Sequence, residues 1–165
     1  MKSILTYNHP ISQTIIHWFA LFVIAALSSF SMSINAAEAN LGKNNLALSG
    51  YDPVSYFDSQ PQKGDKSFSK VYQGATYYFH SQENQAIFEA NPEKYIPAYG
   101  GWCAWAMLDG QKVKVDPLTY KIIEGKNYLY YNGFWGNTLT KWNAKTDTIP
   151  EPDLVQTADT QWSNL

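Results

Sequence analysis

Two aromatic-rich stretches constrain the fold of this chain more than any other feature. In the first, SFSKVY and ATYYF flank Gln73-Gly74; in the second, LTYKIIEGKNYLYYNG (118–133) turns around Glu124-Gly125-Lys126. β-Branched and aromatic residues favour strands, and a short glycine-containing turn between two such runs is typical of a β-hairpin. The sequence therefore predicts two antiparallel hairpins.

A helix is expected directly after the first hairpin. Ser81 is a good N-cap, because its hydroxyl can accept a backbone N–H bond from the first turn. Three residues at helical spacing are expected to face the core, namely Ala86, Ile87 and Ala90. Phe88 is expected beside them. Asn91-Pro92 should end this helix and begin another turn, since proline suits the first helical position.

Further short helices are expected in the second half of the chain. WCAWAML, between Gly100-Gly101 and Asp109-Gly110, predicts a helix with Cys103 and Met107 on one face. The chain after Gly136 is expected to be helical through Trp142, and after Pro150 and Pro152 a short segment carries Leu154, Val155 and Trp162.

These elements predict a small single α+β domain, which is what 165 residues can hold. Cys103 is the only cysteine, so no intrachain disulfide can form. An apolar content of 45% and 26 aromatic residues indicate that the core holds the fold together. The lone thiol is therefore either buried or free for use.

The first forty residues differ from the rest of the chain. The apolar run WFALFVIAALSSF (18–30) is short for a membrane span, and SMSINAAEA supplies small residues for cleavage after Ala36 or Ala39. Residues 1–36 are thus expected to be a Sec-type signal peptide, 37–47 a flexible leader and 48–165 the domain. The protein is expected in the periplasm without a stable membrane span; an uncleaved signal anchor is the alternative.

The charge pattern excludes nucleic acid as a partner. The chain contains no arginine, and after cleavage at Ala36 it carries 11 lysines against 14 acids. Phosphate and nucleic-acid binding depend on basic patches and on the guanidinium group. The partner is therefore expected to be a metal ion or a small ligand, and the sequence does not identify a protein partner.

Enzymatic patterns are absent from the sequence. The acids Asp52, Asp58, Asp109 and Asp116 lie at turn-like positions, where aspartate bonds its own backbone. Cys103 could form a nucleophilic pair with His80, the only histidine after the signal, but sequence shows no residue to orient the imidazole. A closed zinc site is excluded because it needs four Cys or His ligands. The protein is expected to be non-enzymatic.

His80, Cys103 and Met107 form a candidate metal site. Imidazole, thiolate and thioether suit Cu(I), which accepts a low coordination number. The alternative is that Cys103 and Met107 are simply core residues, as these types often are.

Several blocks resemble one known family in order and spacing. GYDPVSYF, YQGATYYFHSQEN, NPEKYIPAYGGWCAWAM, Asp116-Pro117 and GKNYLYYN are similar to exported YHS-domain proteins, over about residues 49–165. The resemblance implies a treble-clef-related core with a C-terminal helical extension. The wider family includes modules in copper pumps and heavy-metal resistance proteins.

The resemblance also bears on the metal site. Where relatives read Phe-Cys-Ser-x-x-Cys-x-x-x-Phe, this chain reads Phe79-His80-Ser81-Gln82-Glu83-Asn84 and then Phe88. His80 thus takes the place of the first cysteine and Asn84 that of the second. The resemblance thus places His80 at a ligand position and leaves Cys103 as the remaining thiol. Together with Met107, named above for its soft donor and its spacing, they are the ligands expected of a copper-type protein for sensing, buffering or delivery.

A second function is open. Aromatic residues around the lone cysteine could line a pocket for a small organic ligand or a protein partner, without any metal. The residues expected to form its walls are Tyr99, Trp102, Trp105 and Trp135.

Overall fold

The computed structural model describes residues 39–58 and 60–165, which lie in one compact unit. The expected signal peptide (1–36) lies outside the described residues. Among the helices of the described part, none has the length and apolar character that a membrane span requires.

The described residues form a small α+β fold with short helices and three two-stranded antiparallel sheets. The strands are β1 (Asp65–Tyr72), β2 (Ala75–Phe79), β3 (Asp116–Ile123), β4 (Lys126–Tyr130), β5 (Asn132–Gly133) and β6 (Gly136–Asn137). The α-helices are α2 (Gln82–Ala90), α3 (Pro92–Tyr95), α4 (Ala104–Met107), α5 (Thr138–Lys145) and α6 (Glu151–Ser163). Four 3₁₀ turns complete the fold: η2 (Lys43–Asn45), η3 (Ala47–Gly50), η4 (Ser55–Asp58) and η5 (Ala98–Gly101).

Both predicted hairpins are confirmed. β1 pairs with β2 and β3 with β4, and each pair is joined by two residues, Gln73-Gly74 and Glu124-Gly125. All four turn residues have positive φ, which matches the type I′ turn that follows the twist of the strands. The third hairpin, β5–β6, was not predicted, because strands of two residues are too short to show alternation.

The helix after the first hairpin begins as predicted, but it faces the other way. The Ser81 hydroxyl accepts the Asn84 N–H at 3.1 Å, so the N-cap is confirmed. The prediction that Ala86, Ile87 and Ala90 face the core is wrong, because all three are exposed. Phe88 is the buried residue of α2, and its ring packs against Tyr72, Tyr77 and Phe79 at centroid distances of 5.1–5.9 Å.

The later helices agree with the sequence in place but not in length. Cys103 precedes α4, and the Met107 N–H donates to the Cys103 carbonyl at 3.0 Å, so the two residues are one turn apart as predicted. The segment after Pro150 is a 13-residue helix, α6, with Pro152 in its first turn, where a missing N–H costs nothing.

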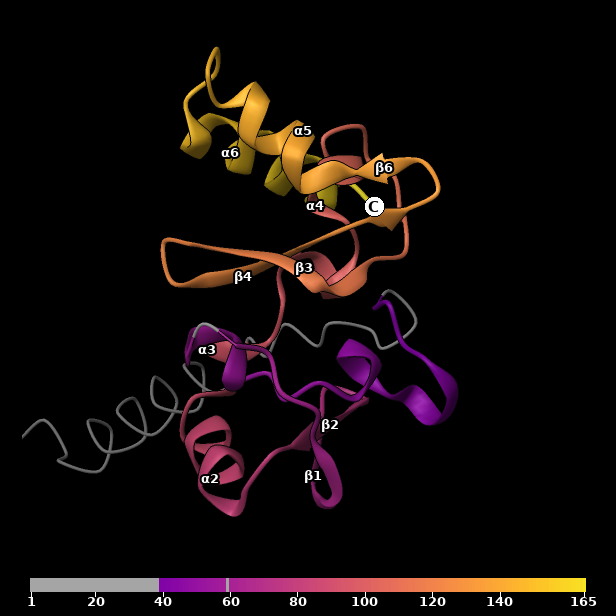
Figure 1. Ribbon diagram of the computed structural model, residues 1–165, viewed down its shortest axis with the longest axis vertical. Helices are drawn as coiled ribbons and strands as arrows, with labels where there is room; N and C mark the ends of the chain where they lie inside the picture. The colour runs from indigo at the N-terminus through magenta and orange to yellow at the C-terminus, as the bar shows by residue number, and fades with distance from the viewer. Residues whose placement is uncertain (1–38, 59) are drawn as a thin grey trace, which may run out of the picture. The chain divides into compact units, whose positions relative to one another are not determined.

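The β3–β4 hairpin lies between two hydrophobic cores. The first core contains Ala47, Leu48, Val54, Tyr56, Ala75, Tyr77, Phe79, Phe88, Tyr95, Ile96 and Leu129. The second core contains Ala98, Tyr99, Ala104, Met107, Ile123, Tyr128, Tyr130, Trp142, Leu154 and Ala158. Figure 1 shows β3 and β4 between α4, α5 and α6 on one side and β1, β2, α2 and α3 on the other.

Side-chain alternation on β4 serves both cores. Leu129 packs into the first core, while its neighbours Tyr128 and Tyr130 pack into the second. Successive residues of a strand point to opposite faces, so a two-stranded sheet buried on both faces can connect two layers.

The described part of the expected leader contacts the domain. The Asn40 N–H donates to the Gly100 carbonyl at 2.9 Å, and its side-chain amide donates to the Gly101 carbonyl at 3.0 Å. Ala47 belongs to the first core. Residues 39–47 are therefore bound along the domain.

Candidate functional site

The junction between β2 and α2 is organised by a buried carboxylate. Asp52 has no exposed surface, and its Oδ1 accepts the Val54 N–H at 2.8 Å. Its Oδ2 accepts the His80 N–H at 2.8 Å and the Asn84 side-chain amide at 2.7 Å. A buried carboxylate is stable only when donors satisfy it, and here three N–H groups do so.

This arrangement gives Asn84 and His80 structural roles. Asn84 stands where the resemblance places a second cysteine, and its amide joins α2 to Asp52 instead of supplying a thiolate. His80 contributes its backbone N–H to the same carboxylate, while the residue as a whole is exposed. The sequence placed Asp52 at a turn, which the Val54 contact supports, but its two partners 28 and 32 residues away gave no local signal.

Cys103 is buried at the meeting point of several elements. Its sulfur accepts the Tyr131 N–H at 3.3 Å and lies 3.4 Å from the Thr138 hydroxyl. Its own N–H donates to the Val113 carbonyl at 3.0 Å, and Cys103 forms an isolated parallel bridge with Leu129. The thiol thus contacts the segment that leads from β4 to α5.

Met107, the last residue of α4, is also buried and belongs to the second core. Its residue type fills irregular apolar space, which is consistent with that position.

The structure does not bring the three predicted ligands together. Cys103 and Met107 are fully buried one turn apart, whereas His80 is exposed at the β2–α2 junction. Figure 1 shows β2 and α4 on opposite sides of the β3–β4 hairpin. Within residues 39–58 and 60–165, no three His, Cys, Asp or Glu side chains are grouped so that they could hold a metal ion.

An open pocket of about 210 Å³ lies over Cys103. Its other lining residues include Trp105, Val113, Tyr131, Trp135, Thr138 and Lys141. Cys103 exposes none of its surface, although the residue is part of the pocket lining. Lys141 is the only charged residue of the lining, and the surface that the lining presents to the pocket is wholly apolar.

Two of the four residues predicted for an aromatic pocket line it, Trp105 and Trp135. Tyr99 is instead a buried member of the second core, and its hydroxyl donates to Asp159 Oδ1 at 2.9 Å. Trp102 is half-buried and packs against the second core. Lys141 lines the pocket but was not predicted. Phe134, next to Trp135, was not singled out either. The only cue to an exposed turn at Phe134-Trp135 was the glycine on each side of the pair.

Burial controls the ionisation of two tyrosine hydroxyls in the second core. Burial, with smaller contributions from the nearby Glu151 and Cys103, raises the pKa of Tyr130 well above its ordinary value of 10. This hydroxyl has no hydrogen-bond partner among the described residues and stays protonated at neutral pH. Burial and the adjacent Asp159 raise the pKa of Tyr99 in the same way. Both phenols are therefore protonated at neutral pH.

Comparison with known families places one domain in this structure. The YHS domain model matches residues 54–99, a narrower span than the resemblance at 49–165. Comparison with curated proteins and with solved structures gave no match. The matched residues run from η4 through α3 into η5, and they supply most of the first core. Cys103 and the residues that line its pocket follow the matched residues along the chain, as does the second core apart from Ala98 and Tyr99.

Proposed function

This chain carries a YHS domain over residues 54–99, and we propose that it is a non-enzymatic protein that binds a small organic anion in the pocket over Cys103. One observation carries the proposal: Trp105 and Trp135 line an open apolar pocket whose only charged lining residue is Lys141. Aromatic walls bind planar apolar groups, and the ammonium group of Lys141, outside the apolar surface of the pocket, would add attraction for negative charge. The proposal assigns this binding to the periplasm, after the export expected from residues 1–36.

The experiment uses 1-anilinonaphthalene-8-sulfonate, a fluorescent aromatic anion that matches both properties of the pocket. Titration of the native protein should show saturable binding at one site. Trp105→Ala should weaken it because a wall is removed, and Lys141→Gln should weaken it because the cation is lost. Leu118→Ala is the control, since Leu118 is an exposed apolar residue outside the pocket. Unchanged binding by Trp105→Ala would contradict the proposal.

Copper remains a second proposal, on the ground that Cys103 belongs to the lining of an open pocket. The Tyr131 N–H at 3.3 Å would stabilise a thiolate there, and thiolate is a preferred ligand of Cu(I). Met107, one turn further along α4, is the second soft donor of this proposal. His80 is exposed at the β2–α2 junction and is not needed in this form.

Anaerobic Cu(I) titration separates the two proposals. Cys103→Ser should lose most of the Cu(I) affinity and Met107→Leu less, while His80→Ala should bind as the wild type does. Cys103→Ser should leave the binding of the organic anion nearly unchanged, because Cys103 exposes no surface to a ligand. Wild-type Cu(I) affinity in Cys103→Ser would contradict the copper proposal and leave the first intact.

A further inference from the structure

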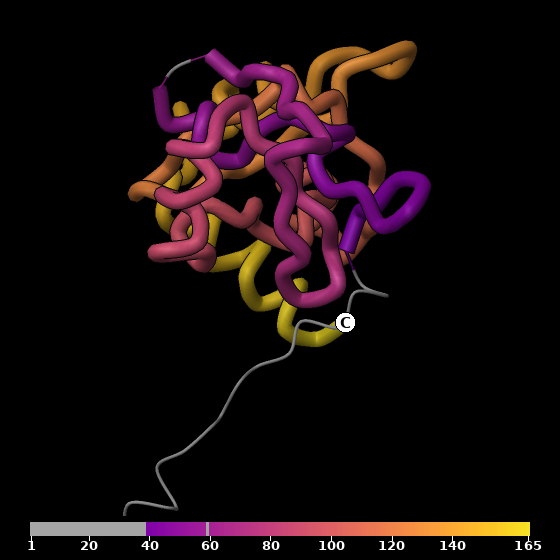
Figure 2. Tube along the Cα trace, turned by 90° about the horizontal axis from the view of Figure 1, so that it is seen from below, coloured from indigo at the N-terminus to yellow at the C-terminus, as the bar shows by residue number. Residues whose placement is uncertain are grey.

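The tip of the β5–β6 hairpin presents two aromatic side chains to solvent. Phe134 is 89% exposed and Trp135 is 76% exposed, more than any other large hydrophobic residue in the described part of the chain. Their ring centroids are 4.9 Å apart at an interplanar angle of 87°, an edge-to-face pair. Figures 1 and 2 show this hairpin projecting away from the rest of the chain. Exposed aromatic pairs are costly in water, so their presence points to a partner.

The hairpin holds this pair in a defined position. The Trp135 N–H donates to the Tyr131 hydroxyl at 3.2 Å, and the Thr138 N–H and hydroxyl both donate to the Tyr131 carbonyl at 2.9 Å. A Cβ on Gly133 would lie 2.7 Å from the Tyr131 hydroxyl, so the close approach of this ring requires glycine. The aromatic pair is thus presented by a fixed turn, which lowers the entropy lost on binding.

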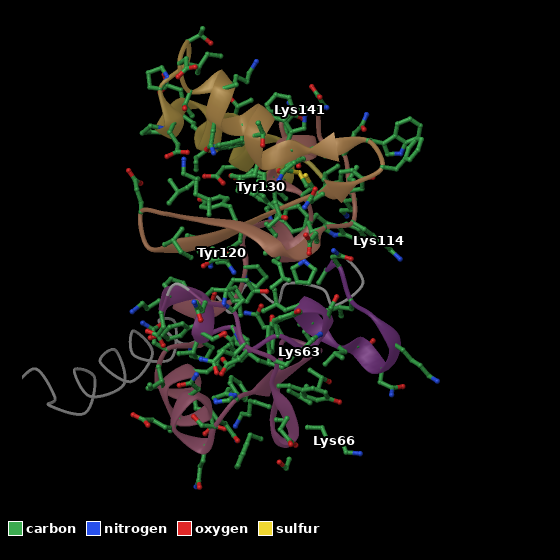
Figure 3. The ribbon with its side chains drawn as sticks, in the orientation of Figure 1. Lys63, Lys66, Lys114, Tyr120, Tyr130 and Lys141 are labelled. Atoms are coloured by element: carbon green, nitrogen blue, oxygen red, sulfur yellow. The ribbon has the colours of Figure 1, made fainter. Side chains whose placement is uncertain are left out.

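The charge around the hairpin is predominantly positive. Residues 131–140 contain no charged side chain. Lys141 follows this stretch and shares a pocket with Trp135, and Figure 3 shows Lys141 and Lys114 above and below the hairpin. Asp116 contacts the hairpin through the Asn132 side-chain amide, but its carboxylate also accepts bonds from the Leu118 N–H and the Thr119 hydroxyl.

We propose that the β5–β6 hairpin docks the protein on an anionic phospholipid surface. Tryptophan and phenylalanine favour the boundary between headgroups and acyl chains, and each lysine near an anionic surface adds to the attraction. The small area of the tip distinguishes lipid from protein. Two aromatic side chains bury roughly 300–500 Å², whereas a stable protein interface buries about 800 Å² on each side.

The experiment measures partition of the full chain onto vesicles of phosphatidylglycerol and phosphatidylcholine, with pure phosphatidylcholine for comparison. Phe134→Ser/Trp135→Ser should lower partition roughly tenfold, because both inserting rings are lost. Val71→Ser, which removes a 63% exposed side chain on β1, should have no effect. All variants share residues 1–38, so differences between them report on the hairpin.

Two further measurements identify the surface and the depth of insertion. Lys114→Ala/Lys141→Ala should reduce binding to the anionic vesicles only, and high salt should remove that difference; Lys66→Ala, on β1, is the control. Brominated lipid should quench the wild type more than Trp135→Phe, because Trp135 enters the bilayer. Equal partition of the wild type and the double serine variant, or no quenching assigned to Trp135, would overturn the proposal. Phe134 does not line the ligand pocket, so Phe134→Ser alone tests the hairpin independently of that pocket.

Discussion

At the scale of single residues, the buried Asp52 carboxylate is expected to have a large effect on stability. Asp52→Ala leaves the His80 N–H and the Asn84 amide without their acceptor in the interior. Hydrogen bonds to a charged group are worth more than neutral ones, and an unsatisfied buried donor costs its desolvation. We therefore expect the free energy of unfolding, measured by urea denaturation, to fall by about 3 kcal/mol.

Two substitutions at His80 separate its backbone from its side chain. His80→Ala keeps the N–H that donates to Asp52, so stability should change by less than about 0.5 kcal/mol. His80→Pro removes that N–H, so its loss of unfolding free energy should approach the loss expected for Asp52→Ala. The exposed Asp58→Ala is the control for removing a carboxylate. A large loss in His80→Ala would mean that the imidazole itself stabilises the fold.

Some of these residue roles could be predicted from the sequence and others could not. The Ser81 cap and the glycine turns were predictable because each depends on neighbours within a few residues. The Asp52 contacts could not be, because they join residues far apart in the chain. Of the candidate site, the sequence identified Cys103, Trp105 and Trp135, but it could not show that His80 lies apart from them.

At the scale of elements, the direction in which a helix faces was the weakest prediction. Ala86, Ile87 and Ala90 have helical spacing, yet α2 buries Phe88, because the rings of β1 and β2 decide which side is covered. The spacing of apolar residues identifies the buried face of a helix only when these residues form a wide apolar stripe. α2 is short and mostly polar, so its orientation follows from tertiary packing.

Glu151 joins α6 to the rest of the second core, and its ionisation should make stability depend on pH. Its Oε1 accepts the Trp142 indole N–H at 2.8 Å and pairs with Lys121 on β3. Partial burial acts to raise the pKa of Glu151, but the hydrogen bonds from Lys121 and Trp142 outweigh it and leave the pKa below its ordinary value of 4.5. The folded state therefore binds this proton less readily than the unfolded state does.

The sign of the pH effect follows from that lowered pKa. The contribution of Glu151 should be complete above about pH 4.5 and should disappear as the pH falls through the folded-state pKa. Glu151→Gln should lower the free energy of unfolding by about 1 kcal/mol at pH 7 and by much less at pH 3. Urea denaturation at the two pH values, with the exposed Asp153→Asn as control, measures the difference. An equal loss at both values would contradict the assigned ion pair.

At the scale of the whole molecule, stability should not depend on a metal ion. Two hydrophobic cores contain every buried hydrophobic residue of the described part except Cys103, and apolar burial needs no ion. A chelator should therefore leave the melting temperature unchanged, unlike in zinc-finger domains, which unfold without metal. Differential scanning calorimetry with and without EDTA tests this expectation, and a shift of several degrees would reveal a structural ion.

The connection between the two cores gives the last prediction. Leu129 has no exposed surface and packs into the first core, while its neighbour Tyr130 packs into the second. Leu129→Ala should cost about 2–5 kcal/mol, because it leaves a cavity in a close-packed interior. If β4 couples the layers, both should unfold together, as small domains usually do.

Fluorescence can test that coupling, because Trp142 is buried in the second core and Trp102, Trp105 and Trp162 pack against it. Far-UV circular dichroism reports on the backbone of both layers. Leu129→Ala should shift the urea midpoint equally by the two methods, although the substitution lies in the first core. A fluorescence midpoint that stayed at the wild-type value while circular dichroism shifted would show that the layers unfold separately. The YHS domain at 54–99 would then be stable without the layer that contains Cys103 and its pocket.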